Sequence, residues 1–430
     1  MKQIKGETGM IKLLIIADDF TGALDTGVQF AGIGVQTLVT TNEEYDFLEG
    51  PKPQVLVMDA ETRHKSPEEA YEVVHRITKQ ACMAGVSHIY KKTDSALRGN
   101  IGSELQAVLD GTGSDELHFL PAFPRLNRIT KDGVQMVDGI PVHESVFGKD
   151  PFEPVVCSYI PDIIGLQSKL KVEIVTGKRS GVREPGKRIV VYDTEKESEL
   201  YEIGAELFVK GKHTVMAGCA GAAAVLPKIL GLAGKAPVFP QMNKHFIVVC
   251  GSVNPITRAQ LDFAQLHGFK RIRFRPEEKL DPACWEGTSG REKIHRLIAE
   301  AALQPRLILD TNDPEGTSET LDYAREKGFA LQEVRLTISK TLGMVVKKML
   351  EGDIRNTILL TGGDTLLGFM NQMNVQELRP LGELDVGTVL SEFEQEGKNF
   401  YIISKSGGFG KEDLLVKIAE GLKEKGEREN

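Results

Sequence analysis

Short apolar runs alternate with amphipathic stretches along the whole chain. These runs show no regular alternation of hydrophobic and polar residues, so they should be buried on both faces, as in a parallel sheet covered by helices. The predicted strands lie at 13–17, 35–40, 54–60, 87–93, 117–122, 188–193 and 213–218 and, after a break, at 245–252, 271–274, 306–311, 357–362 and 399–406. Alternation of such strands with helical stretches indicates the α/β fold class.

The break in this pattern predicts a domain boundary. Residues 231–245, GLAGKAPVFPQMNKH, are rich in glycine and proline and have no clear period. We therefore expect one domain over residues 1–235 and a second over 243–430, each a mainly parallel sheet flanked by helices, with a cleft between the domains. A second irregular stretch, 146–162, is expected to be a long loop within the first domain.

Composition and charge narrow the class of protein. A hydrophobic content of 41% and a charged content of 27% are typical of a soluble globular chain. The net charge of -8 argues against a nucleic-acid-binding protein, which needs a basic face, whereas small anions can still bind at local sites. The five cysteines are scattered without a C-x-x-C pair, which favours reduced thiols in the cytoplasm. No stretch has the length and composition of a signal peptide or a membrane span.

In the C-terminal half, three predicted strands run directly into glycines and then into a helix. Glycine lets the backbone approach a ligand closely, and the free N–H groups of a helix start favour anions. Three such junctions predict a polyphosphate site, although neither the Walker spacing nor G-x-G-x-x-G is present. Asn254 is expected to cap one of these helices, with Pro255 in its first turn. The junction residues are Gly251, Ser252, Gly362, Gly363, Asp364, Thr365, Gly407, Gly408 and Gly410.

In the N-terminal half, the predicted strand ends carry acids and bases instead. This mixture suits a small polyhydroxy acid, because Arg or Lys can hold its carboxylate and Asp can accept hydrogen bonds from its hydroxyls. The side chains in question are Asp18, Asp19, Thr62, Arg63, His64, Lys91, Lys92, Thr93, Asp94, Ser95, Arg98, Asn100, Arg125, Asn127, Arg128 and Thr130.

Several of these residues also have ordinary structural explanations. Asp19 lies where an N-cap is expected, so we assign Asp18 to the site and Asp19 to the helix. Lys91 and Lys92 alternate across a strand, so one of them should face solvent. Arg125 and Arg128 can be surface charges on a loop, so we do not assign both to the site. His64 and His143 have no local spacing that would make a metal site, and residues 353–383 are expected to be solvated charge.

Six ordered motifs resemble those of the four-carbon acid sugar kinases. They are IADDFTGALD, KKTDSALRGNIGSEL, PAFPRLNRITKDG, GSVNPITRAQ, LTGGDTLLG and KSGGFG, and they extend from Leu13 to about Asp413. The resemblance implies an N-terminal substrate domain and a C-terminal nucleotide domain. It also implies ATP-dependent phosphorylation of D-threonate, D-erythronate or a 3-oxo-tetronate at O4, with Mg²⁺ accompanying ATP.

The resemblance assigns residues by motif. The substrate side would be Asp18, Arg63, Lys92, Thr93, Asp94 and Ser95, and the ATP side would be Ser252, Gly362, Gly363, Asp364, Thr365, Gly407 and Gly408. Asp18 and Asp94 are both candidates for the catalytic base, and Asp364 could instead hold Mg²⁺.

Two positions depart from the family pattern. Asn127 replaces a usual glycine, and asparagine tolerates the left-handed conformation that glycine would adopt there. Asn254 lies where many relatives have serine, which leaves Ser252 as the hydroxyl of that loop.

The expected partners are the sugar acid and ATP, and a homodimer is one candidate assembly. We expect binding neither to nucleic acid nor to a membrane. An ATP-dependent ligase and a non-catalytic sensor of a phosphorylated sugar acid are the rival interpretations. The preferred four-carbon acid and the metal ligands stay open.

Overall fold

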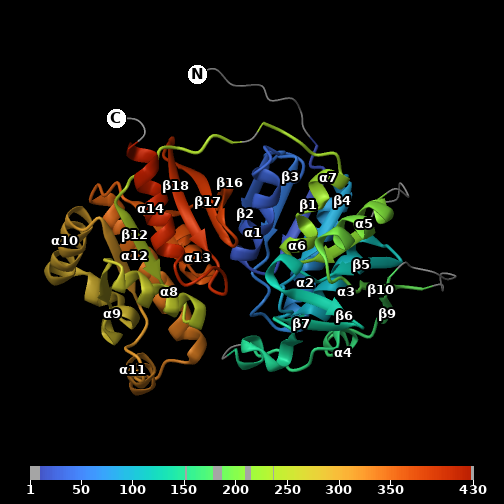
Figure 1. Cartoon of the computed structure of the whole chain (residues 1–430), viewed down its shortest axis with the longest axis horizontal. Coiled ribbons are helices and arrows are strands. Elements are labelled where there is room, and N and C mark those ends of the chain that lie inside the picture. Colours follow the sequence, from blue (N-terminus) through green and yellow to red (C-terminus); the bar gives the residue numbers. More distant parts are fainter. Residues whose placement is uncertain (1–9, 151–152, 178–185, 209–214, 236, 428–430) are drawn as a thin grey trace. The chain divides into compact units, whose positions relative to one another are not determined.

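The fold is that of a computed structural model that describes residues 10–150, 153–177, 186–208, 215–235 and 237–427. The chain divides into two compact units, Met1–Pro237 and Val238–Asn430 (Figure 1). Both units combine a sheet with flanking helices, so the predicted α/β class is confirmed. The interdomain cleft stays a prediction. No helix in the described ranges has the length and apolar character needed to cross a membrane.

The first unit is built around a parallel sheet with the strand order β2-β3-β1-β4-β11-β5-β10-β9. A small antiparallel sheet, β6-β7-β8, follows β5 in the chain. The elements are β1 (Leu13–Ala17), α1 (Phe20–Ala31), β2 (Thr37–Thr40), β3 (Val55–Asp59), α2 (Pro67–Met83), β4 (His88–Lys92), α3 (Ile101–Thr112), β5 (Glu116–Leu120), β6 (Arg128–Lys131), β7 (Val134–Val137), β8 (Ile140–Pro141), α4 (Ile160–Gly165), β9 (Lys171–Val175), β10 (Arg188–Tyr192), α5 (Glu197–Phe208), β11 (Val215–Gly218), α6 (Ala220–Ala223) and α7 (Leu226–Ile229), with 3₁₀ turns at Pro124–Leu126, Val142–Glu144 and Val146–Lys149.

Helices cover the parallel sheet of the first unit. Helix α2 packs against α3, and α3 packs against α4, whereas α1 and α5 both contact α6. Strands β1, β3 and β10 are buried along their whole length, as their continuous apolar sequences predict. The register pairs Ala17 with both Asp59 and Lys92, so the carboxyl ends of β1, β3 and β4 lie side by side.

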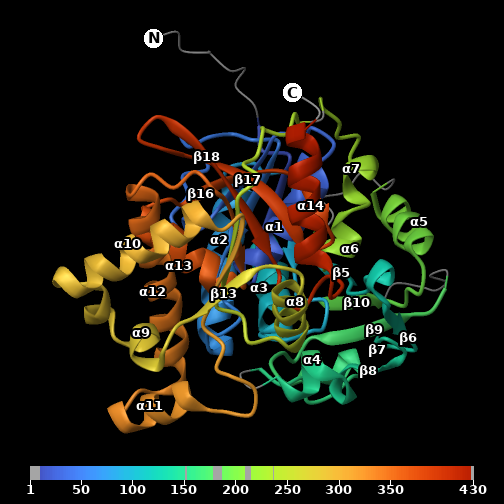
Figure 2. The same ribbon diagram turned by 60° about the vertical axis from the view of Figure 1, so that its left-hand side comes forward.

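The second unit has a mixed sheet with the strand order β13-β14-β12-β15-β18-β17-β16. Strands β13, β14, β12, β15 and β18 are parallel, while β16 and β17 extend the sheet in antiparallel fashion. Helix α8 packs against α14, and α12 packs against α13 (Figure 2). The elements are β12 (Phe246–Cys250), α8 (Pro255–Leu266), β13 (Lys270–Arg273), α9 (Pro276–Leu280), a 3₁₀ turn (Pro282–Trp285), α10 (Gly287–Leu303), β14 (Arg306–Asp310), α11 (Glu319–Lys327), α12 (Leu331–Glu351), β15 (Thr357–Thr361), α13 (Gly363–Met373), β16 (Glu377–Asp385), β17 (Thr388–Gln395), β18 (Lys398–Lys405) and α14 (Leu414–Glu427).

Two parts of the sequence prediction need correction. The interpretation of residues 353–383 as solvated charge is wrong for most of the stretch, because β15 is buried along its length and much of α13 is buried. At its end, β16 begins at Glu377 and alternates between buried and more exposed positions. Such alternation belongs to a strand covered on one face, whereas the predicted strands are continuous apolar runs. The expected loop over 146–162 is interrupted by a 3₁₀ turn at Val146–Lys149 and ends in the first turn of α4.

Candidate active site

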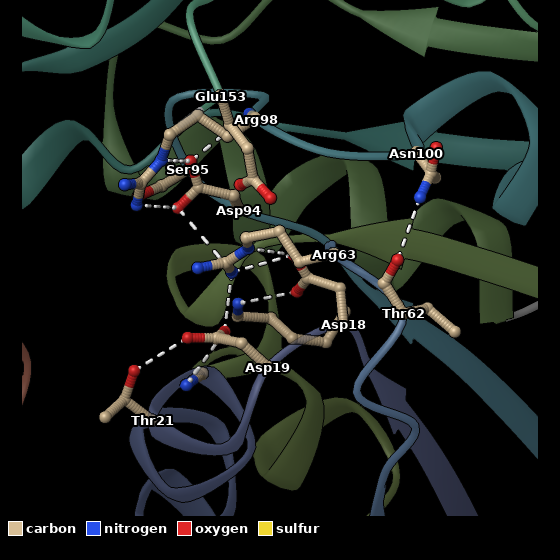
Figure 3. Close-up of polar contacts among 12 residues, drawn as sticks. Asp18, Asp19, Thr21, Thr62, Arg63, Asp94, Ser95, Arg98, Asn100 and Glu153 are labelled. Atoms are coloured by element: carbon tan, nitrogen blue, oxygen red, sulfur yellow. Dashed lines mark hydrogen bonds and ion pairs between the residues drawn. The ribbon is translucent and has the colours of Figure 1, made fainter. Parts of the chain in front are cut away.

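The adjoining ends of β1, β3 and β4 gather a cluster of charged side chains around Arg63 (Figure 3). The Arg63 guanidinium donates from Nε to Asp18 Oδ2 at 2.8 Å and from Nη2 to Asp19 Oδ1 at 2.6 Å. The same Nη2 lies 4.0 Å from Asp94 Oδ1. A single guanidinium thus fixes two carboxylates and approaches a third.

Asp19 caps helix α1, as the sequence predicts. Its Oδ1 accepts from the Gly22 amide at 3.1 Å, and its Oδ2 accepts from Thr21 Oγ1 at 2.7 Å. Burial raises the pKa of Asp19, but the nearby Arg63 and Lys92 cations outweigh burial and lower it. Asp19 therefore serves the helix start and the charged cluster together.

Gly22 explains the Thr-Gly that follows the paired acids in the sequence. A Cβ at this position would lie 2.4 Å from Asp19 Oδ1 and 2.5 Å from Lys92 Nζ. Both distances are far below contact, so only glycine leaves room for the Lys92 ammonium over the first turn of α1.

Asp18 differs from its neighbour in having an oxygen without a hydrogen-bond donor. The side chain is 2% exposed, and Arg63 occupies Oδ2. No donor among the described residues reaches Oδ1; the Lys92 ammonium is 3.8 Å away. This oxygen can accept a hydrogen bond from a ligand.

Asp94 is held by Arg98 through both carboxylate oxygens. Arg98 Nε donates to Oδ2 at 2.8 Å and Nη2 donates to Oδ1 at 3.2 Å, while Nη1 reaches Asp150 at 3.1 Å. Burial raises the pKa of Asp94, but Arg98 and Arg63 together hold it well below its usual range. Asp94 is therefore a firmly ionised carboxylate and a weak base.

The hydroxyls beside Asp94 differ in their surroundings. Thr93 Oγ1 is buried and has no hydrogen-bond partner within the described part of the chain. Ser95 Oγ accepts from Arg128 Nη1, and the Arg128 guanidinium lies over the Phe147 ring at 5.0 Å. The Thr93 hydroxyl thus has both its donor and its acceptor capacity left for a ligand, while the Ser95 hydroxyl can still donate.

Lys91 and Lys92 are both buried, so the prediction that one faces solvent is wrong. Lys92 reaches over α1, while Lys91 Nζ contacts Glu104 Oε2 at 2.9 Å and the Lys92 carbonyl at 2.8 Å. The two side chains do alternate across β4, but both faces of that strand are covered. Burial raises the pKa of Glu104, and Lys91 partly offsets this.

The two arginines of the following loop differ in their burial. Arg128 is buried beside Ser95, and Arg125 is exposed. Asn127 adopts φ +54°, so it does take the left-handed conformation. His64, which has no local carboxylate partner in the sequence, contacts Glu153 from a distant loop. This pair was missed because nothing in its sequence spacing indicates it.

In the second unit, the three glycine junctions lie next to one another at the ends of β12, β15 and β18. Strand β15 pairs with both of the others. A Cβ on Gly407 would lie 2.7 Å from Ser252 Oγ, and one on Gly362 would lie 3.4 Å from Ser252 Cβ. Gly362 also has φ +99°, which favours glycine. The glycines therefore permit close packing around the Ser252 side chain.

The two helices that leave these junctions begin differently. Asn254 caps α8 by accepting from the Ile256 amide at 3.0 Å, with Pro255 in the first turn, so that prediction is confirmed. Helix α13 has Gly362 at its N-cap and no side-chain cap. Its first amides, from Gly363 to Thr365, are uncapped by side chains and suit an anion.

Asp364, a candidate magnesium ligand in this loop, is ion-paired. Arg335 Nη1 lies 3.1 Å from its Oδ1. Among the described residues, no group of three or more His, Cys, Asp and Glu side chains is placed to hold a metal ion. An ATP-bound magnesium can still be held mainly by phosphate and water oxygens.

Comparisons with known proteins identify the family. A sugar-binding N-terminal domain family matches residues 13–226, and a nucleotide-binding C-terminal domain family matches residues 247–415. A D-erythronate kinase of Heliobacterium modesticaldum is 34% identical over 83% of this chain and 84% of its own length. The chain belongs to the four-carbon acid sugar kinase family.

Further comparisons match over nearly the whole length of both chains. A D-threonate kinase of Salmonella typhimurium is 28% identical over 94% of this chain and 97% of its own. A solved structure from Salmonella typhimurium LT2, described as a candidate tRNA synthase, has a TM-score of 0.75 at 19% identity and covers 95% of this chain and 99% of its own. That likeness shows the shared fold.

Proposed function

We propose that this kinase transfers the γ-phosphoryl group of ATP to the terminal O4 hydroxyl of D-threonate or D-erythronate. Family membership supports the reaction class, and the names of the two relatives support these two acids. The observation that carries the proposal is the buried cluster around Arg63, which combines cations for a carboxylate with an Asp18 oxygen that has no hydrogen-bond donor among the described residues.

The acid would bind through its carboxylate to cations and through its hydroxyls to acceptors. Lys92 and Arg63 are the proposed cations, although Arg63 also holds Asp18 and Asp19. Thr93 Oγ1 and Ser95 would contact hydroxyls, alongside Asp94. Phosphoryl transfer depends on such positioning more than on covalent chemistry.

Asp18 is our choice for the carboxylate that orients the O4 hydroxyl and accepts its proton. A base needs a free oxygen within hydrogen-bond reach of the proton. Asp18 Oδ1 has no donor in the described ranges, whereas both oxygens of Asp94 accept from Arg98. The low pKa of Asp94 further disfavours it as a base.

ATP would bind at the glycine junctions of the second unit. Amides from Gly363 to Thr365 and at Gly407 and Gly408, together with Ser252, would contact its phosphates, and Gly362, whose own amide donates to the Lys405 carbonyl, would let the backbone turn at this point. Bound ATP supplies the phosphoryl group, and its magnesium neutralises phosphate charge. Asp364 would have to leave Arg335 to bind that ion.

The test is an ADP-release assay with D-threonate, D-erythronate, a 3-oxo-tetronate and no acid. We expect the highest kcat/KM with one of the first two, and phosphorus NMR should place the phosphate on O4. Preference for the 3-oxo acid would select the family alternative, and ATP binding without any acid-dependent turnover would favour a sensor. A homodimer and a cytoplasmic location stay predictions, which light scattering and cell fractionation can check.

A further inference from the structure

The loop that follows β18, residues 406–411, is held by side chains that donate hydrogen bonds to its carbonyl groups. Lys405, the last residue of β18, donates from Nζ to the Ser406 carbonyl at 2.8 Å. Thr257 of α8 donates from Oγ1 to the Gly407 carbonyl at 2.8 Å. The two side chains also contact each other, with Lys405 Nζ 3.3 Å from Thr257 Oγ1.

Gln260, one turn further along α8, anchors the far end of the same loop. Its Nε2 donates to the Phe409 and Lys411 carbonyls, both at 3.0 Å. Thr257, Gln260 and Lys405 are all buried. The backbone of the loop is thus fixed through four carbonyl groups, none of which is left to face a ligand.

Because these carbonyl groups are held, the directions of the neighbouring amide N–H groups are fixed as well. In a planar trans peptide, the carbonyl of one residue and the N–H of the next point in opposite directions. With the Ser406 and Gly407 carbonyls directed at Lys405 and Thr257, the N–H groups of Gly407 and Gly408 must point the other way. Neither amide has a backbone acceptor in the described part of the chain.

A purely structural role does not account well for Lys405. Burying an ammonium group costs free energy, and an apolar side chain of similar volume would usually fill the space at no loss of stability. Lys405 is 1% exposed, and its hydrogen bonds include one to the Ser406 carbonyl of the loop and one to Thr257, which holds the next carbonyl. Its contacts are those expected of a group that sets backbone direction.

We propose that Lys405 and Thr257 are positioning residues that aim the amides of Gly407 and Gly408 at a phosphate of the bound nucleotide. The inference rests on the proposed binding of ATP by the second unit. Neither side chain needs to touch the nucleotide, because each acts through the peptide that it holds.

The test uses two substitutions at one position. Thr257→Val keeps the shape of the side chain but removes the hydroxyl, and Thr257→Ser keeps the hydroxyl as the matched control. Calorimetry would measure MgATP binding, and inhibition by adenosine would report the nucleoside part of the site. Thermal unfolding and the KM for the acid would report structural damage.

We expect Thr257→Val to weaken MgATP binding about tenfold, the order of one hydrogen bond to a charged group. Adenosine inhibition and the KM for the acid should not change, and Thr257→Ser should bind MgATP like the unaltered protein. Lys405→Met should weaken MgATP binding further. If Lys405→Met fails to fold, the comparison of Thr257→Val with Thr257→Ser still tests the proposal.

Three results would overturn the inference. They are normal MgATP binding by Thr257→Val, equal losses of MgATP and adenosine, and no recovery in Thr257→Ser. Absence of MgATP binding by the unaltered protein would overturn it together with the kinase proposal. If MgATP binding follows the expected pattern but no acid is phosphorylated, the positioning role stands and the proposed substrate falls.

Discussion

The two units each bury a lysine at the end of a strand, and the two lysines differ in their partners. Lys91 in β4 and Lys405 in β18 both donate from Nζ to the carbonyl of the next residue at 2.8 Å. Lys91 is also paired with the Glu104 carboxylate, whereas Lys405 contacts the Thr257 hydroxyl.

The sites proposed next to the two lysines would recognise an anion in two different ways. Near Lys91, the groups proposed to bind the substrate are side chains of both charges. Their arrangement depends on ion pairs such as that of Arg63 with Asp18. Near Lys405, the groups proposed to bind the nucleotide are backbone amides, and side chains act by holding the peptides that carry them. Charge-removing substitutions should therefore act most strongly in the first unit, and an added methyl group should act most strongly in the second.

Removing the charge of Asp18 should have the largest effect. Asp18→Asn keeps the shape but removes the proposed proton acceptor, so kcat should fall roughly 10²–10⁴-fold. The KM for ATP should not change, because the glycine loops are untouched. Steady-state kinetics would check this; a normal kcat with a raised KM for the acid would make Asp18 a binding residue only.

An added methyl group at Gly408 should impair ATP binding next most strongly. A Cβ there would meet only Asn254 Nδ2, at the ordinary contact distance of 3.7 Å, so the fold should tolerate Gly408→Ala. We expect about a tenfold higher KM for ATP, the order of one lost amide contact to phosphate. Gly421→Ala is the control, because nothing lies within 4 Å of its Cβ. Equal kinetics in both variants would remove Gly408 from the site.

The stability contributed by Asp94 should depend on pH. Its pKa is lowered in the folded protein, so the ionised carboxylate stabilises the fold above the ordinary value of 3.8, and this stability is lost as the pH falls through the lowered pKa. Asp94→Asn removes one titrating group. The difference in free energy of unfolding from the unaltered protein should shrink below about pH 4, by at most about 1.4 kcal/mol per pH unit. Urea unfolding across this range would measure it, and a difference that is independent of pH would contradict the assignment.

The sequence predicted what depends on neighbouring residues. Continuous apolar runs located the buried parallel strands, and residue type with position predicted the Asp19 and Asn254 caps. Contacts between distant segments could not be found in this way. The burial of Lys91 needs Glu104 from α3, and His64 meets Glu153 from another loop.

The support behind the glycine loop was missed for the same reason. Glycines indicated a phosphate site, but the contact between Thr257 and Gly407 joins residues 150 positions apart. Only the folded chain shows which carbonyls are held and hence where the amides point.

Asp19 should give the smallest effect and completes the comparison within the paired acids. Asp19→Asn keeps an oxygen for the Gly22 amide but loses the charge that faces Arg63, which still has Asp18 at 2.7 Å. Because asparagine caps helices well, we expect a loss of about 1 kcal/mol or less in the free energy of unfolding, with most of kcat retained. Asp19→Ala removes the cap as well and should cost about 0.5–2 kcal/mol. Denaturant unfolding and kcat measured on both variants would separate the cap from the chemistry. If Asp19→Asn abolishes turnover while Asp18→Asn stays active, the roles of the two acids are reversed.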